Sequence, residues 1–327
     1  MSLRLIAEIG VNHDGDPGLA VEMAQEAAAA GFDAVKLQHW HVDELLAAQA
    51  PNAAYQGQGD QHELLERLRL DADGLSRVRE AAHRAGVAFV VTPDGVRACH
   101  DLVVLGVDAL KIGSGDADNP WLLESAVASG LPLIVSTGMM DDSEVIALGT
   151  RVRDARDVTV LHCVSAYPTP TERCGLPRMA SLAALTGRPV GFSDHTIGVA
   201  AAAAAVALGA VAIEKHVTYS TSATGPDHAM SLPLAAAPEW VAALRDIEKA
   251  LTENRAADAE AANRPLVRKG LYARHDLDAG ARLEAGDVVP LRPLLDGIAA
   301  GDRDAVVGRT LAARVAAGTL LRPTDLR

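Results

Sequence analysis

The stretch that decides the fold is residues 3–38, which read LRLIAEIGVNHDGDPGLAVEMAQEAAAAGFDAVKLQ. A short apolar run at 3–9 is followed by an Ala-rich segment with helical periodicity, and a second apolar run occupies 34–38. Gly31 stands where the helical segment ends, as a left-handed C-cap requires. This order of strand, helix and strand is typical of the βα unit of a parallel sheet.

The same unit repeats as far as about residue 250. Apolar runs occur at 3–9, 34–38, 87–92, 109–112, 131–136, 158–164, 189–192 and 210–214. Glycine again ends the preceding helical segment at Gly86, Gly130 and Gly209. Eight βα units in a stretch of this length predict a (β/α)8 TIM barrel. An open doubly wound sheet is the alternative, but no Gly-x-Gly-x-x-Gly turn follows the first run.

Composition restricts the class of protein. The chain has 327 residues, 49% of them hydrophobic, so it can bury a large core. A formal net charge of -13 argues against sequence-independent binding to nucleic acid or to an anionic membrane. Cys99, Cys163 and Cys174 have no metal-type spacing and are interpreted as reduced thiols. With no export signal and no long apolar stretch, we expect a cytoplasmic protein.

The composition changes after the eighth unit. A charged, Ala-rich helical segment leads to Asn263-Arg264-Pro265, which is typical of a linker. We therefore predict a catalytic barrel at 1–250, a helical linker at 251–265 and a small domain at 266–327.

The predicted small domain contains an internal echo. Residues 279–283 read AGARL and are followed by Asp287, while residues 317–321 read AGTLL and are followed by Asp325 at the same spacing. Such segments predict a compact module of short strands and turns. A domain of about 60 residues is near the lower limit for folding alone, so we expect it to dock on another surface.

Polar residues cluster where the predicted barrel strands end, which is where TIM barrels carry their active sites. Burial without partners would cost each such group roughly 2–7 kcal/mol, so the set predicts a functional site. Its members are Glu8, Asn12, His13, Lys36, Gln38, Thr92, Lys111, Ser114, Asp116, Ser136, Thr137, His162, Ser165, Tyr167, Ser193, Asp194, His195, Glu214, Lys215 and His216.

Two chemistries follow from this set. Lys36 and Lys111, each within an apolar strand and near hydroxyl groups, predict a pocket for a phosphate plus a carboxylate. A Schiff-base lysine is the alternative, although anion-binding hydroxyls suit a charged lysine better. His195 and His216, on consecutive strands, predict a divalent-cation site, with Glu214 and Asp227 as further ligand, base or supporting group.

The motifs resemble those of the sialic acid synthases, which include N-acetylneuraminate, legionaminate and pseudaminate synthases. The resemblance covers the whole chain, and the segment from about 266 is similar to the antifreeze-like (SAF) domain of these enzymes. It therefore implies a TIM barrel followed by a small β-rich SAF domain. The blocks that carry it are AEIGVNH at 7–13, VKLQ at 35–38, KIGSGD at 111–116, STGM at 136–139, LHC at 161–163, YPTP at 167–170, GFSDHT at 191–196, IEKH at 213–216 and GPDH at 225–228.

The resemblance also implies roles for individual residues. Phosphoenolpyruvate binding is implied for Lys36, Thr92, Lys111, Ser114, Ser136, Ser165 and Ser193, sugar binding for Gln38, Tyr167, Asp227 and Arg292, catalysis for Glu8, Glu214 and Asp227, and binding of a divalent metal for His195 and His216. The metal would be Mn²⁺, with Mg²⁺ or Co²⁺ as alternatives. Arg292 would reach the site of a second subunit in a domain-swapped homodimer.

Two positions depart from the family pattern. The family's Thr-Pro-Phe-Asp reads Thr92-Pro93-Asp94-Gly95 here, and Ser165 stands where asparagine is frequent. The reaction that the resemblance implies is condensation of phosphoenolpyruvate with N-acetylmannosamine or a related amino sugar. The products are a 2-keto-3-deoxy nonulosonic acid and phosphate. The alternatives are a metal-dependent pyruvate aldolase and a non-catalytic sugar-binding relative.

Overall fold

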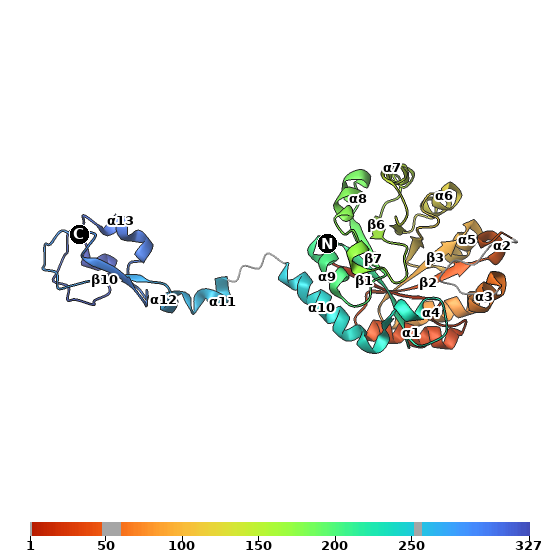
Figure 1. Cartoon of the computed structure of the whole chain (residues 1–327), viewed down its shortest axis with the longest axis horizontal. Coiled ribbons are helices and arrows are strands. Elements are labelled where there is room, and N and C mark those ends of the chain that lie inside the picture. Colours follow the sequence, from red (N-terminus) through yellow and green to blue (C-terminus); the bar gives the residue numbers. More distant parts are fainter. Residues whose placement is uncertain (1, 48–59, 252–256) are drawn as a thin grey trace. The chain divides into compact units, whose positions relative to one another are not determined.

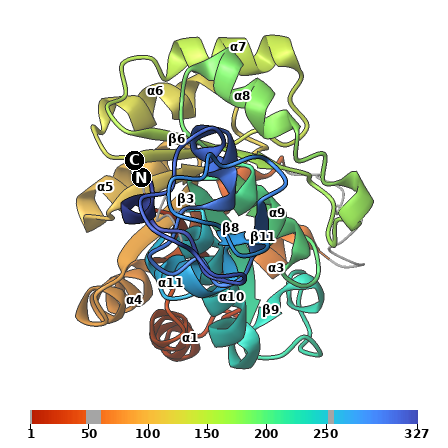
Figure 2. The same ribbon diagram turned by 90° about the vertical axis from the view of Figure 1, so that its left-hand side faces the viewer.

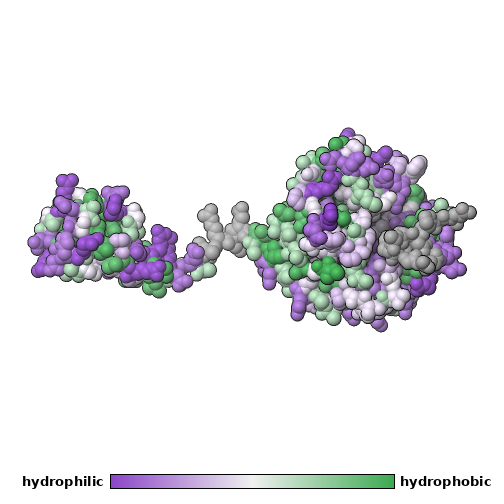
Figure 3. Space-filling model, viewed as in Figure 1, coloured by the Kyte–Doolittle hydropathy of each residue, from purple (hydrophilic) through white to green (hydrophobic). Residues whose placement is uncertain are grey.

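A computed structural model describes residues 2–47, 60–251 and 257–327. The chain divides into two compact units, Met1–Thr252 and Glu253–Arg327, and each unit has its own hydrophobic core (Figure 1). Among the described residues, no helix has both the length and the apolar character needed to cross a membrane. On the faces seen in Figure 3, hydrophilic and hydrophobic residues are interspersed over both units.

The first unit is a closed parallel barrel, which confirms the predicted TIM-barrel fold. Each of the eight strands pairs with the next in sequence, and β1 pairs with β8 to close the barrel. A short ninth strand, β9 (Leu232–Pro233), pairs in parallel with the end of β8. The barrel strands are β1 (Arg4–Gly10), β2 (Ala34–Trp40), β3 (Ala88–Asp94), β4 (Ala109–Ile112), β5 (Leu133–Ser136), β6 (Val158–Cys163), β7 (Val190–Asp194) and β8 (Ala212–Thr218).

Helices surround the barrel as an outer ring (Figure 2). They are α1 (Pro17–Ala29), α2 (Val42–Leu45), α3 (Gln61–Leu68), α4 (Ala72–Arg84), α5 (Val96–Leu105), α6 (Pro120–Ala128), α7 (Asp142–Arg151), α8 (Arg178–Thr186), α9 (Ala200–Ala207) and α10 (Ala237–Ala250). Asp16 caps α1 by accepting hydrogen bonds from the backbone N–H groups of Gly18 and Leu19. The predicted C-cap glycines, Gly31, Gly86, Gly130 and Gly209, all have positive φ.

Side chains alternate between the two faces of each barrel strand, and this alternation places the residues of the site. Outward side chains such as Leu5, Val35 and Val91 join the main core beneath the helices. Inward side chains form a separate apolar layer inside the barrel, made of Ile6, Ala34, Val90, Ala109, Ile134, Leu161 and Ala212. Two residues further along each strand the next inward position lies nearer the carboxyl end. There the inward side chains are mostly polar, so the apolar layer is the floor of the site.

Several strands extend beyond the predicted apolar runs. β3 continues to Asp94, β7 to Asp194 and β8 to Thr218. The runs were defined by apolar residues, but the last residues of these strands include polar groups that are buried by pairing. A criterion based on hydrophobicity therefore ends these strands too early.

The second unit consists of α11 (Ala257–Ala261), α12 (Arg264–Val267), β10 (Gly270–Ala273), β11 (Val288–Leu291), α13 (Arg303–Val306) and short 3₁₀ turns. β10 and β11 pair in antiparallel fashion. α11 and the start of α12 fall within the predicted linker, of which residues 252–256 lie outside the described part.

The internal echo corresponds to two turns of the same construction. Asp287 accepts a hydrogen bond from the N–H of Glu284 at 2.7 Å, and Asp325 accepts one from the N–H of Arg322 at 2.8 Å. The residues just before these turns, Leu283 and Leu321, are both buried in the small core. The echo therefore places equivalent leucines in the core through equivalent turns.

Candidate active site

A cavity of about 410 Å³ opens among the carboxyl ends of the barrel strands. Its lining includes Glu8, Lys36, Gln38, Thr92, Asp94, Lys111, Ser114, Ser136, Cys163, Ser165, Tyr167, Ser193, His195, Glu214 and His216. Asp227 lines an adjoining cavity of about 130 Å³ together with Gln38, Tyr167 and His216. Arg292 is exposed and follows β11 in the second unit. The structure thus gathers the barrel residues for which the resemblance implies a substrate, catalytic or metal role around two neighbouring cavities.

A buried network of lysines and carboxylates forms the centre of the larger cavity. The Lys36 Nζ atom lies 2.8 Å from Glu8 Oε2, 3.1 Å from Thr92 Oγ1 and 3.7 Å from Glu214 Oε2. The Lys111 Nζ atom lies 3.9 Å from Glu214 Oε1. Both lysines and both carboxylates are almost fully buried. Buried charges are tolerated only when paired, and here each is paired with the opposite sign.

The pKa values of the two glutamates are shifted in opposite directions. Burial raises the pKa of Glu8 to about 7, although Lys36 opposes the shift and Gln38 donates a hydrogen bond to Glu8 Oε1 at 3.0 Å. Burial also acts to raise the pKa of Glu214, but Lys111 and Lys36 outweigh it and the pKa is lowered. Near neutral pH Glu214 is therefore ionised, while Glu8 can accept or release a proton.

The raised pKa of Glu8 predicts a pH-dependent effect on stability. A carboxyl whose folded pKa lies above its unfolded value favours folding when protonated, so its contribution is lost as pH rises from about 4.5 to 7. Glu8→Gln lacks this loss. The free energy of unfolding of the variant minus that of the wild type should therefore increase by up to about 3 kcal/mol between pH 5 and pH 8. Urea unfolding of both proteins at the two pH values measures this, and titrating groups away from the network of Lys36 and Glu214 contribute equally to both proteins. A difference that does not change with pH would contradict the shift.

Two imidazoles face each other at the rim of the network. His195 follows β7 and His216 belongs to β8, with ring centroids 5.6 Å apart. His195 Nδ1 lies 2.9 Å from the carbonyl oxygen of Val164, and the tautomer that donates this hydrogen bond leaves the Nε2 lone pair available. His216 Nδ1 is buried, has no hydrogen-bond partner among the described residues, and lies 3.7 Å from Asp227 Oδ2.

These donors fit a divalent transition metal. Burial lowers the pKa of His195 and of His216, so both rings are neutral at pH 7, as metal binding requires. Glu214 and Asp227 add carboxylate oxygens nearby. A set of imidazole nitrogens and carboxylate oxygens suits ions such as Mn²⁺, Co²⁺ and Zn²⁺.

Some lining residues escaped the sequence analysis. Asp94 lines the cavity, and burial, reinforced by Asp116, raises its pKa to about 7. The sequence did contain a sign of this residue's importance, because Asp94 stands where the family pattern has phenylalanine. Gly138 lies behind two lining serines: its N–H donates to Ser114 Oγ at 3.0 Å, and a Cβ atom there would lie only 2.6 Å from Ser165 Oγ.

Other strand-end residues do not reach the cavity. His162 points outward and its Nε2 atom lies 2.6 Å from the carbonyl oxygen of Cys174, whereas the next residue, Cys163, lines the cavity. Lys215 likewise points away from the site and pairs with Asp194 at 3.0 Å. The alternation of a strand separates these structural residues from their functional neighbours.

Fold and site together define a class of (β/α)8 protein with a buried lysine pair and an imidazole pair at the carboxyl end of the barrel. The chain belongs to the NeuB family, which matches residues 23–256, and residues 268–327 match the SAF domain.

Named relatives extend over nearly the whole chain. The N,N'-diacetyllegionaminic acid synthase of Legionella pneumophila is 37% identical, covering 98% of this chain and 94% of the relative. The enzyme of the same name from Campylobacter jejuni is 33% identical, covering 93% and 94%. The N-acetylneuraminic acid synthetase structure from Leptospira borgpetersenii, in complex with citrate, is 30% identical with a TM-score of 0.71, covering 81% of this chain and 92% of that one.

Proposed function

We propose that this protein condenses phosphoenolpyruvate with the open-chain aldehyde form of an amino sugar. The products are a nine-carbon 2-keto-3-deoxy acid and inorganic phosphate. The observation that carries the proposal is the buried pair of Lys36 and Lys111 in one cavity with the hydroxyls of Ser114, Ser136 and Ser193. Two cations with several short hydroxyl donors are what a small molecule bearing both phosphate and carboxylate needs.

Charge balance supports a divalent cation at His195 and His216. Phosphoenolpyruvate carries three negative charges when its phosphate is fully ionised, and ionised Glu214 adds a fourth. Lys36 and Lys111 offset two of these four charges, and a divalent cation offsets the other two. Glu8, when ionised to act as a base, adds a further negative charge that also favours a cation. Such an ion supplies Lewis-acid polarisation of the sugar's aldehyde oxygen. We propose Mn²⁺, with Mg²⁺ or Co²⁺ as substitutes.

The residues of the chain have separate tasks in this reaction. Lys36 and Lys111 hold the phosphate and carboxylate so that C3 of phosphoenolpyruvate meets the aldehyde carbon and forms the new C–C bond. The π electrons of the aldehyde move to its oxygen, which takes up a proton and becomes a hydroxyl. Positive charge develops at C2, water adds there, and the C–O bond to phosphate breaks as the C2 ketone forms. Glu8, fixed by Lys36 and Gln38, is assigned to accept the proton of that water.

We propose that the sugar carries two acetamido groups. The relatives reported above with 37% and 33% identity are both named N,N'-diacetyllegionaminic acid synthases. Phosphoenolpyruvate contains no nitrogen, so both acetamido groups of such a product must come from the sugar. Gln38, Tyr167 and Asp227, which line the smaller cavity, are placed to bind it.

The test is direct. Pure protein is incubated with phosphoenolpyruvate, Mn²⁺ and a panel of hexoses with one or two acetamido groups, and products are identified by mass. Phosphate release that depends on both substrates supports the condensation. Turnover with pyruvate in place of phosphoenolpyruvate would instead support the aldolase, and no product with any sugar would favour a binding protein.

The buried, unpaired cysteines accord with the cytoplasmic location that we propose.

We further propose a homodimer in which Arg292 completes the sugar site of a partner chain. Arg292 is exposed in its own unit, and the backbone beside it is held by a hydrogen bond from Tyr272 Oη to the carbonyl oxygen of Pro293 at 2.7 Å. Its planar guanidinium suits the carbonyl oxygen of an acyl group. Arg292→Ala should raise the KM of the sugar or lower turnover while leaving phosphoenolpyruvate binding nearly unchanged.

Mixing inactive Glu8→Ala with Arg292→Ala, at a sugar concentration where Arg292→Ala alone shows little turnover, tests where Arg292 acts. In a mixed dimer of Arg292→Ala and Glu8→Ala, one site carries both defects and the other carries neither. With random exchange about a quarter of the sites should regain activity. Lys36→Met mixed with Glu8→Ala is the matched control, because every barrel then retains a defect. Exchange without recovery in the first mixture would show that Arg292 does not act in the partner's site.

A further inference from the structure

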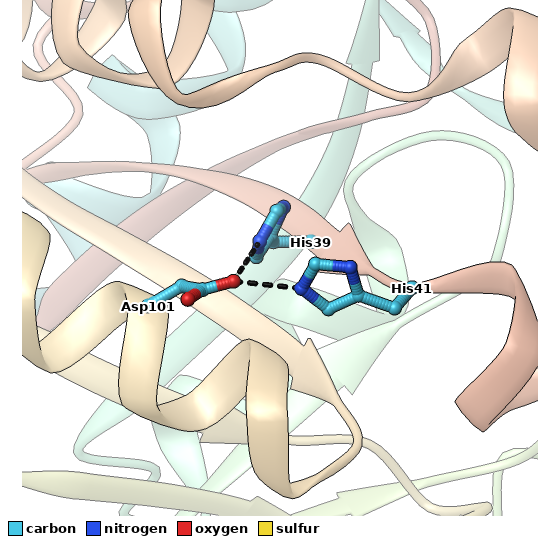
Figure 4. A group of neighbouring side chains, drawn as sticks. All are labelled: His39, His41 and Asp101. Atoms are coloured by element: carbon cyan, nitrogen blue, oxygen red, sulfur yellow. Dashed lines mark hydrogen bonds and ion pairs between the residues drawn. The ribbon is translucent and has the colours of Figure 1, made fainter.

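A second group of donor side chains lies on the outer side of the barrel. His39 is in β2, His41 follows this strand directly, and Asp101 is on α5 (Figure 4). Gln38, the residue before His39, lines the active-site cavity, so His39 points to the opposite side of the sheet. The three residues are absent from the lining of either active-site cavity within the described parts of the chain. The cluster is therefore separate from the proposed catalytic site.

The two imidazoles converge on one carboxylate oxygen. His41 Nε2 lies 2.7 Å from Asp101 Oδ2, and His39 Nε2 lies 3.3 Å from the same atom, as the dashed lines in Figure 4 show. The ligand atoms of all three residues lie within 4.8 Å of one another. Ligands on one tetrahedral ion with bonds of about 2.1 Å are separated by roughly 3.4 Å. Only a small outward shift of the side chains would admit an ion.

An ordinary surface pair does not explain this arrangement. His83 and Asp108, with Nε2 and Oδ2 2.8 Å apart, show that one imidazole is enough to pair with a surface carboxylate. At Asp101 a second ring, the buried His39, is directed at the same oxygen. His39 Nδ1 has no hydrogen-bond partner among the described residues, so Nε2 is the ring nitrogen that makes the polar contact.

We propose that His39, His41 and Asp101 bind a divalent cation of the zinc class. Two imidazole nitrogens and one carboxylate oxygen are the ligands preferred by Zn²⁺ and Co²⁺ rather than by Mg²⁺ or Ca²⁺. Water would complete the coordination, since His41 and Asp101 are partly exposed and the ion can enter from solvent. The positive charge of Arg69 acts on His39 and would oppose a bound cation. This charge is offset, because Arg69 is paired with Glu66 Oε2 at 3.2 Å.

The ion would join two elements next to the active site. His39 and His41 lie at the carboxyl end of β2, the strand that also supplies Lys36 and Gln38 to the cavity. Asp101 lies on α5, the helix after β3, and β3 pairs with β2 at His39 and Trp40. Bound ion would thus clamp α5 to the end of β2 and stabilise the folded barrel by mass action.

Metal stoichiometry of the full-length protein tests the site. The protein is stripped with chelator, equilibrated with Zn²⁺ and then with Co²⁺, and analysed by elemental mass spectrometry and calorimetry. The background is His195→Gln plus His216→Gln, which removes the proposed catalytic ligands. This background should still bind one ion per chain, and Zn²⁺ should raise its melting temperature. Adding His41→Gln or Asp101→Asn, both at partly exposed positions, should abolish the binding and the shift.

His83→Gln is the matched control, because it removes a histidine from a His–Asp pair that has no second imidazole. In the same background it should leave ion binding and the Zn²⁺-dependent shift intact. The proposal is overturned if the background binds no ion, or if His41→Gln and Asp101→Asn bind it as tightly as the His83→Gln control. Neither result depends on turnover, so the proposed synthase activity is tested independently.

Discussion

Lys36→Met is expected to weaken phosphoenolpyruvate binding, measured by calorimetry, by at least about 30-fold. Removing one partner of a buried, hydrogen-bonded charge pair costs about 2–5 kcal/mol, or roughly 30-fold to several thousandfold in affinity. Lys36 also contacts Thr92 and both glutamates, so its loss removes positive charge from the centre of the site. With Glu214 still ionised, the cavity of the variant would repel a trianionic substrate.

The design separates lost binding from lost folding. Lys111→Met is the second variant, because within the described residues Lys111 has a single carboxylate contact, at 3.9 Å, and supports the network less than Lys36 does. Lys249→Met, at an exposed lysine on α10, is the matched control for removal of a positive charge. Circular dichroism and melting temperature establish that each variant is folded. Wild-type affinity in a folded Lys36→Met or Lys111→Met protein would refute the phosphate-binding role.

Periodicity predicted the barrel because each strand begins with residues that the core requires to be apolar. Leu5 and Val35, for example, pack beneath the helices, and Ile6 and Ala34 pack inside the barrel. The same requirement does not extend to the carboxyl ends of the strands, where inward residues face the cavity. This is why β8 was predicted to end at Glu214, although the strand continues through His216 to Thr218.

The predicted strand ends located the site, but they did not show whether each side chain points into the cavity or away from it. Glu214, Lys215 and His216 are consecutive polar residues of β8, yet the first and third line the cavity while Lys215 pairs with Asp194 outside it. Alternation could have made this distinction once the strand was placed. The shift in the pKa of Glu8 could not have been read in the same way, because it depends on burial and on the distances to Lys36 and Glu214.

The cluster at His39 shows a different limit. His39, in β2, and His41, just after it, are two residues apart, which the sequence displays, but Asp101 is on α5 and its approach depends on the packing of that helix. A pair of histidines at this spacing carries little information without the third ligand. Folding supplies that ligand, and with it the hypothesis of an ion.

Chelation should eliminate turnover, and Mn²⁺, Co²⁺ or Mg²⁺ should restore it. His195 and His216 are neutral imidazoles beside two carboxylates, and the paired lysines alone leave two negative charges of bound phosphoenolpyruvate and Glu214 unbalanced. Loss of the ion should therefore weaken phosphoenolpyruvate binding as well as block the reaction. Substitution of a residue that supports a metal ligand lowers metal affinity about 10- to 100-fold. His195→Gln and His216→Gln remove proposed ligands themselves, so each should lower the affinity of the activating metal by more than this.

The measurement is activity against free metal concentration, with metal content verified after chelation. His83→Gln controls for loss of a histidine outside both clusters, and it should need no more metal than the wild type. High Mn²⁺ should partly restore turnover in His195→Gln, because the remaining ligands, His216 with Glu214 and Asp227 nearby, can still hold an ion weakly. Full activity in protein shown to contain no metal would remove the cation from the reaction. The lysines would then have to bind a trianion beside Glu214 without further positive charge, which the geometry of the buried network opposes.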